Sequence, residues 1–81
     1  DTQQEEQIRS LVKIYENMKP KDAARILEEL EMTTLLQVAE RMSERKLAPV
    51  MANMNPGKAK AITEELAKLR QLVAGAHTAG G

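Results

Sequence analysis

The sequence carries an apolar pattern that repeats every twelve residues. Within one unit the apolar side chains stand at i, i+3, i+4 and i+7, the spacing of one face of an α-helix. Nineteen of the twenty positions in five units are apolar, whereas an apolar content of 42% would give about eight. The units are Leu11, Ile14, Tyr15, Met18; Ala23, Ile26, Leu27, Leu30; Leu35, Val38, Ala39, Met42; Leu47, Val50, Met51, Met54; and Ala59, Ile62, Thr63, Leu66.

One long helix cannot bury this pattern, because twelve residues at 3.6 per turn rotate each apolar face by about 120° from the last. The chain must therefore break between units. Pro20 and Pro56 suit the first turn of a helix, where a missing N–H costs nothing. Side chains that can cap the other helices stand at the remaining breaks: Thr33 or Thr34, Ser43 and Asn55.

The pattern predicts an all-α fold of five short helices joined by turns of one or two residues. The expected helices span 3–18, 20–31, 33–42, 44–54 and 56–74. We expect Pro49 in the first turn of the fourth helix, which would move its start toward residue 46 or later.

A longer symmetry supports the same fold. Asn17-Met18-Lys19-Pro20 recurs thirty-six residues later as Asn53-Met54-Asn55-Pro56. Units of this kind cannot bury their faces alone, so we expect them to stack as a right-handed superhelix. We divide the chain into an N-terminal helix over 1–18, a helical-repeat domain over 19–74 and a flexible tail over 75–81. The abrupt helical start is also what the end of an upstream coiled coil would give.

No set of side chains predicts catalysis. The single histidine, His77, stands in the small-residue tail, and neither Ser10 nor Ser43 has a base nearby to activate it. Cysteine is absent, so thiolate chemistry is excluded. We therefore expect no enzyme activity, no cofactor and no metal site. Acidic pairs such as Glu64 and Glu65 are explained by helical ion pairs with Lys68, with weak divalent-ion binding as the alternative.

Charge and composition exclude two other classes of partner. Twelve basic residues balance twelve acidic ones, and Tyr15 is the only aromatic residue, so nucleic-acid binding is not expected. No apolar run approaches the roughly 20 residues of a membrane span, so this chain is not expected to contact a membrane.

A protein partner is the remaining class. The first and last helices have apolar residues at heptad spacing, which suits packing on their own domain, a partner's groove or a homodimer. Met32 stands apart from the core pattern, at a turn. The predicted partner-binding residues are Ile8, Leu11, Met32, Leu69, Leu72 and Val73.

The stretch from Tyr15 to Leu30, with Met18, Pro20 and an Asp-Ala-Ala at 22–24, resembles the helical repeat of the intracellular N-terminal domain of MgtE magnesium transporters. The middle domain of the flagellar switch protein FliG is similar. The second copy, Met54-Asn-Pro56-Gly-Lys-Ala59, is most similar to the C-terminal domain of MotE-like flagellar proteins. The resemblance covers roughly residues 8–72.

The MotE-like resemblance implies a chaperone or assembly factor for a flagellar motor component in bacteria. It also implies a full-length protein anchored in the membrane, with this domain on the periplasmic side of the inner membrane. The MgtE-like resemblance implies instead a cytoplasmic domain that regulates a magnesium transporter in response to Mg²⁺. From the sequence we favour the MotE-like function and keep the MgtE-like function as the alternative.

Overall fold

From the second helix onward, successive helices begin twelve residues apart, at residues 20, 32, 44 and 56. The computed structural model describes the backbone of residues 2–79 and the side chains of residues 2–71. Within that range five helices and no strands form, which confirms the all-α prediction. The helices are α1 (Thr2–Asn17), α2 (Pro20–Leu27), α3 (Met32–Ala39), α4 (Glu44–Ala52) and α5 (Pro56–Ala79).

The repeat is also present in the backbone hydrogen bonds. Each of the first four helices is followed by a tight turn, in which a backbone N–H donates to the carbonyl three residues earlier over 3.1–3.2 Å. The donors are Met18, Leu30, Met42 and Met54, each twelve residues after the last. Asn17 and Asn53, thirty-six residues apart, each donate from Nδ2 to the carbonyl four residues before. The sequence repeat is therefore a repeat of local structure.

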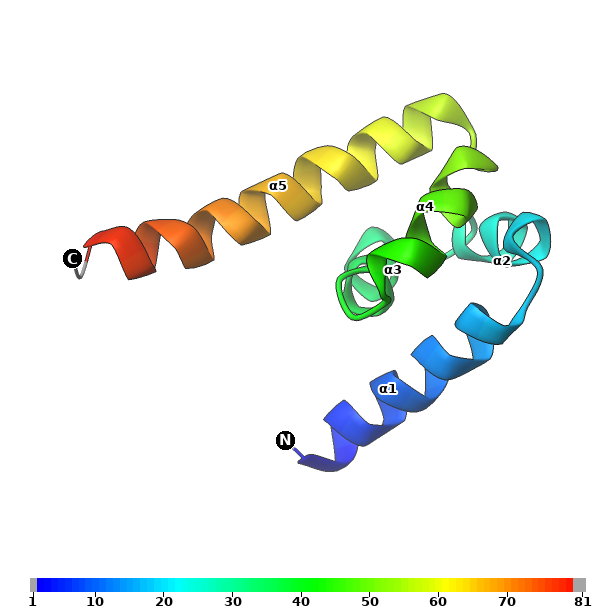
Figure 1. The fold of residues 1–81 in the computed structure, drawn as a ribbon, viewed down its shortest axis with the longest axis horizontal. Helices are drawn as coiled ribbons and strands as arrows, with labels where there is room; N and C mark the ends of the chain where they lie inside the picture. Colours follow the sequence, from blue (N-terminus) through cyan, green and yellow to red (C-terminus); the bar gives the residue numbers. More distant parts are fainter. Residues whose placement is uncertain (1, 80–81) are drawn as a thin grey trace.

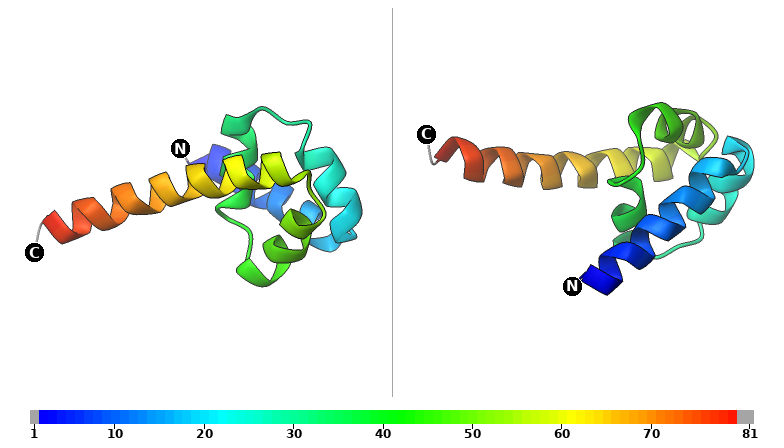
Figure 2. Two further views of the ribbon diagram at one scale, coloured as in Figure 1. Left: turned by 90° about the horizontal axis from the view of Figure 1, so that it is seen from above. Right: turned by 60° about the horizontal axis from the view of Figure 1, so that its bottom comes forward.

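Helices pack against the helix two places further along the chain. α1 contacts α3, α2 contacts α4 and α3 contacts α5, while α1 also contacts α2. Figures 1 and 2 show the three short helices gathered into a body, with α1 along one side and α5 extending far beyond it. The right-handed sense of the stack stays a prediction.

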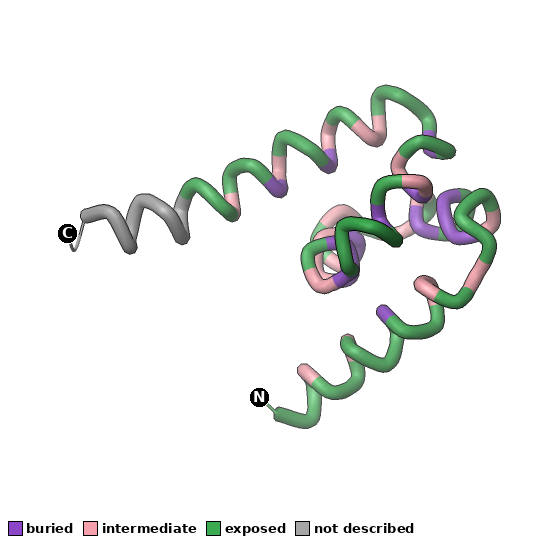
Figure 3. Tube along the Cα trace, in the orientation of Figure 1, coloured by how far each residue is buried: buried purple, intermediate pink, exposed green. Residues whose placement is uncertain are grey.

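The buried core includes residues of all five helices, and Figure 3 shows the buried positions along the trace. Leu27, Leu35, Val38 and Ile62 are fully buried. The rest of the core consists of Val12, Ala23, Ala24, Ala39, Met42, Leu47, Val50, Met54 and Leu66. Most of these residues stand at the predicted repeat positions.

The predicted helix ends were too long in the middle of the chain. α2 ends at Leu27 rather than residue 31, and α3 ends at Ala39 rather than residue 42. The last residues of each unit form the tight turns instead of a further helical turn. α5 extends the other way, to Ala79, past the predicted end at residue 74. The predicted division into domains stays a prediction.

Two local predictions were wrong. Thr33 and Thr34 lie inside the first turn of α3, and the residue before that helix is Glu31, whose side chain makes no capping bond. Pro49 does not lie in the first turn of α4, as predicted, but inside the helix, which begins at Glu44. The start is fixed there because Ser43 Oγ accepts from the Lys46 N–H at 3.3 Å. The predicted caps at Ser43 and Asn55 are confirmed, with Asn55 Oδ1 accepting from Gly57 N–H at 2.8 Å.

Candidate docking surfaces

One repeat position is exposed at the start of the chain and buried afterwards. Its side chain is 54% exposed at Ile14 and 39% exposed at Ile26, but 0–2% exposed at Val38, Val50 and Ile62. The difference follows the packing of helices two places apart, because among the described helices α1 and α2 are the two with none packed two places before them. This position is therefore covered by the helix two places earlier. Ile14 and Ile26 mark the uncovered beginning of the stack.

A neighbouring repeat position shows the opposite trend. It is buried at Val12 and Ala24, half-buried at Leu36, and exposed at Ala48 and Lys60. Within the described part of the chain, α4 and α5 are the helices with none packed two places after them. This position is therefore covered by the later helix, and its exposure at Ala48 marks the uncovered end of the stack.

A groove between α4 and α5 lies at that uncovered end. It encloses about 450 Å³ and is lined mainly by apolar side chains, with Glu44 and Arg70 as its charged members. The remaining lining residues are Leu47, Ala48, Met51, Thr63, Leu66 and Ala67. A concave apolar surface with a few charged groups is typical of a site for a partner's apolar side chains.

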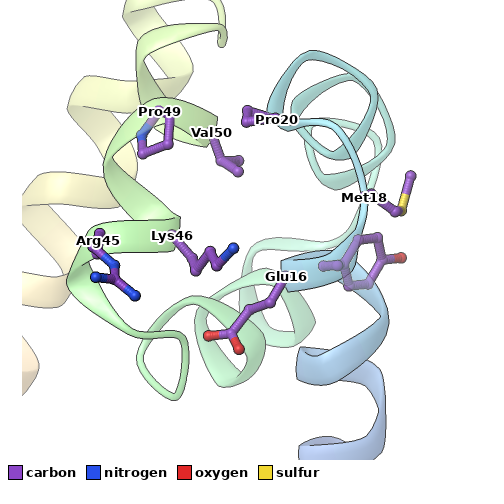
Figure 4. A pocket seen from close by; sticks show the side chains of 8 residues that line it. Glu16, Met18, Pro20, Arg45, Lys46, Pro49 and Val50 are labelled. Atoms are coloured by element: carbon purple, nitrogen blue, oxygen red, sulfur yellow. The ribbon is translucent and has the colours of Figure 1, made fainter.

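A smaller hollow of about 190 Å³ lies between the end of α1, the start of α2 and α4 (Figure 4). Its charged side chains are Glu16, Arg45 and Lys46. Glu16 is engaged, because its Oε2 accepts from the backbone N–H of Ser43 at 2.8 Å. Tyr15, Met18, Pro20, Pro49 and Val50 complete the lining. None of these lining residues pairs a nucleophile with a base.

A third hollow, of about 340 Å³, surrounds the ion pair between α1 and Arg41, which follows α3. Arg41 Nε donates to Glu5 Oε2 at 2.8 Å, and Arg41 Nη2 donates to Glu5 Oε1 at 2.9 Å. Arg41 Nη1 also donates to the Gln37 carbonyl and to Glu40. These hydrogen bonds lower the pKa of Glu5 below its ordinary value and raise the pKa of Arg41. The residues around this hollow therefore connect α1 to the end of α3 through an ion pair.

Two carboxylates, one in α1 and one directly after α2, each bind the start of the helix three places further along the chain. Glu16 binds the backbone N–H of Ser43, and Glu28, twelve residues later, binds the backbone N–H of Asn55. Ser43 and Asn55 are the residues that precede α4 and α5. An anion is favourable at such a helix start, because the backbone N–H groups there have no partner within the helix. Neither contact could be predicted from the residues alone, because each joins positions 27 residues apart.

The structure separates the predicted partner-binding residues. Ile8, Met32 and Leu69 are half-buried and pack against the core, whereas Leu11 is 38% exposed. Leu72 and Val73 belong to α5, but the structure does not describe their side chains. Their role in binding stays a prediction. The groove residues Leu47, Ala48 and Met51 were missed, because Leu47 and Met51 were assigned to the core from their spacing.

Neither a metal-binding cluster nor a membrane-spanning helix is found in the part of the chain that the structure describes. There, no cluster of three or more acidic, histidine or cysteine side chains could hold a metal ion. The described helices also include none with the length and apolar character needed to cross a membrane.

A family model described as the MgtE intracellular N domain matches residues 3–71. This match confirms the MgtE part of the resemblance and does not extend to the flagellar FliG-like and MotE-like part. No curated protein and no solved structure matches the chain.

Proposed function

Because this chain belongs to the MgtE intracellular N domain family, we propose that it is a non-catalytic regulatory module of an MgtE-type magnesium transport system, acting by docking on another protein. The observation that carries the proposal is the extent of the family match, which covers all five helices up to residue 71 of α5. The proposal reverses our preference from the sequence, which favoured the flagellar function.

The docking surface in this proposal is the groove between α4 and α5. Its floor includes Leu47 and Leu66, which belong to the core, so the groove is held in shape by the packing beneath it. Pre-formed surfaces lose less conformational entropy on binding than flexible ones. A rigid groove with a charged residue on each helix, Glu44 and Arg70, suits a partner helix with an apolar face.

The magnesium response in this proposal belongs to the acidic surface. Asp22 pairs with Arg25 at 3.5 Å, and Glu65 pairs with Lys68 at 3.3 Å, in both cases at the exposed surface. Divalent cations screen exposed pairs and compete for their carboxylates without disturbing the core. Glu65 stands one residue before the groove residue Leu66, so Mg²⁺ there would change the charge beside the docking surface.

The test is a binding measurement between this chain and an MgtE-type transporter that lacks its own N domain, with and without millimolar Mg²⁺. We expect binding that Mg²⁺ alters and that Ala48→Asp abolishes, because a carboxylate would enter the apolar groove. Thr33→Asp adds the same charge on the exposed first turn of α3 and should leave binding unchanged. Binding that is absent, or that ignores Mg²⁺, would contradict the proposal.

A flagellar function is the second candidate, and two observations favour it. The start of α5, with Met54, Pro56 and Ala59, resembles MotE-like proteins, and this 24-residue helix projects well beyond the body, as a partner-binding or coiled-coil segment does (Figure 1). In that case the domain acts as a motor chaperone at the periplasmic side of the membrane. Binding to a flagellar motor polypeptide that Mg²⁺ does not alter would favour this function over the first.

A further inference from the structure

We propose that the groove between α4 and α5 of one molecule receives helix α1 of a second copy, so that the helical stack continues from molecule to molecule. The contact joins the uncovered end of one stack to the uncovered beginning of another. It uses the same groove as the docking surface proposed above, so a second copy and a transporter helix would compete for it, and self-association is measured without any other protein present.

The receiving surface is apolar at the position that the next helix covers elsewhere in the stack. Val12 in α1 and Ala24 in α2 are buried, and α3 and α4 are the helices packed two places after them. Ala48 is the equivalent residue in α4 and is exposed in the groove, beside Leu47 and Met51. A further helix packed on α4 would bury Ala48 as the others are buried.

The incoming helix must present the residues that other helices use for the same contact. In α3, Val38 stands at the position that an earlier helix covers and is fully buried, as is Leu35 one turn before it. The equivalent residues in α1 are Leu11 and Ile14, which are 38% and 54% exposed. Helix α1 therefore carries apolar residues in the same spacing as α3, and they are much more exposed than their counterparts there.

The surroundings of these residues favour docking on an apolar surface. Gln7 and Ser10 stand one helical turn before Leu11 and Ile14, and both are uncharged. Burying an unpaired charge is the main cost of covering a helix surface. Because this face carries no charge, its burial in the groove avoids that cost.

Lys60 limits the contact to one helix. It occupies in α5 the position of Val12, Ala24 and Ala48, and it is exposed. A second helix packed on α5 would meet this ammonium group, which the long side chain can carry to solvent, so α1 rather than α2 of the incoming copy makes the close contact. The contact is small, so we expect association at high concentration rather than a permanent dimer.

The contact is tested with two variants that each block one side. Ile14→Asp places a charge on the incoming helix, and Ala48→Asp places one in the groove; both residues are exposed, so the fold is retained. Because the contact joins two different surfaces, each variant should stay monomeric alone. An equimolar mixture restores one intact contact and should form 1:1 pairs. Mass is measured by light scattering over a concentration series, with circular dichroism as the check on folding.

The unmodified chain should form dimers and larger species as its concentration rises, and Thr33→Asp should behave like it. The proposal is overturned if the unmodified chain is monomeric throughout, if either variant alone still associates, or if the mixture of variants stays monomeric. A monomeric chain whose groove binds an amphipathic peptide unrelated to α1 would assign the groove to another protein and would equally overturn the proposal.

Discussion

Arg41 holds Glu5 through two parallel hydrogen bonds of 2.8 and 2.9 Å, joining residues 36 positions apart in the chain. This planar arrangement fixes the first half of α1 against the end of α3. Paired Arg–carboxylate bonds are more directional than single ones, because the fork of the guanidinium matches both oxygens. The pair therefore helps to set the position of α1 relative to α3, in addition to the apolar packing between the two helices.

Glu5→Gln should loosen the first turns of α1 while leaving the rest of the fold intact. The glutamine amide has one acceptor oxygen, so it can accept only one of the two hydrogen bonds from Arg41, and it lacks the negative charge of the carboxylate. Native-state hydrogen exchange should show faster exchange in α1 and unchanged exchange in α3. Glu6→Gln, at the neighbouring exposed position, is the control. Equal exchange in the two variants would show that the pair does not hold the helix.

The stabilising effect of Glu5 should disappear in acid. Hydrogen bonding from Arg41 lowers the pKa of Glu5 in the folded state, so its contribution is fully present above the unfolded value and is lost as the pH falls through the lower folded value. The urea midpoints of the unmodified chain and Glu5→Gln should differ at pH 6 and converge in the acid range below about pH 4. A constant difference at every pH would contradict this assignment.

Glu28→Gln should destabilise the start of α5. The carboxylate of Glu28 accepts from the backbone N–H of Asn55, and the amide would keep a weaker neutral bond. We expect a loss of about 0.5–1 kcal/mol in the free energy of unfolding, reduced by the exposure of the contact. Glu29→Gln, one residue further in the same turn and exposed, should change it by less than half as much. Chemical denaturation of both variants makes the comparison.

The sequence predicted the helical fold well, because the twelve-residue register depends only on where apolar residues stand. Helix starts at residues 20, 44 and 56 follow from Pro20, Ser43 and Pro56, whose local chemistry suits the first turn. The ends were less predictable, since Glu28 and Glu40 are good helix formers that nonetheless form turns when the next helix packs back.

The candidate surface was harder to predict, because exposure depends on neighbours that a repeat position alone does not reveal. Leu11, Ile14 and Ile26 fit the apolar pattern as well as Leu35 does, yet they are exposed. The missing information was that helices pack two places apart, which leaves both ends of the stack uncovered. Once that packing is known, the same register assigns Ala48 to the groove.

The same substitution at two equivalent repeat positions should have very different effects. Ile62 is fully buried, and Ile62→Ala should lower the free energy of unfolding by about 2–5 kcal/mol, because it leaves a cavity between α5 and the core. Ile14 is 54% exposed, and Ile14→Ala should cost less than about 1 kcal/mol. Thermal and urea unfolding at low concentration, where the chain is monomeric, measure both. Equal losses would mean that α1 is covered in the isolated chain and that the stack has no open beginning.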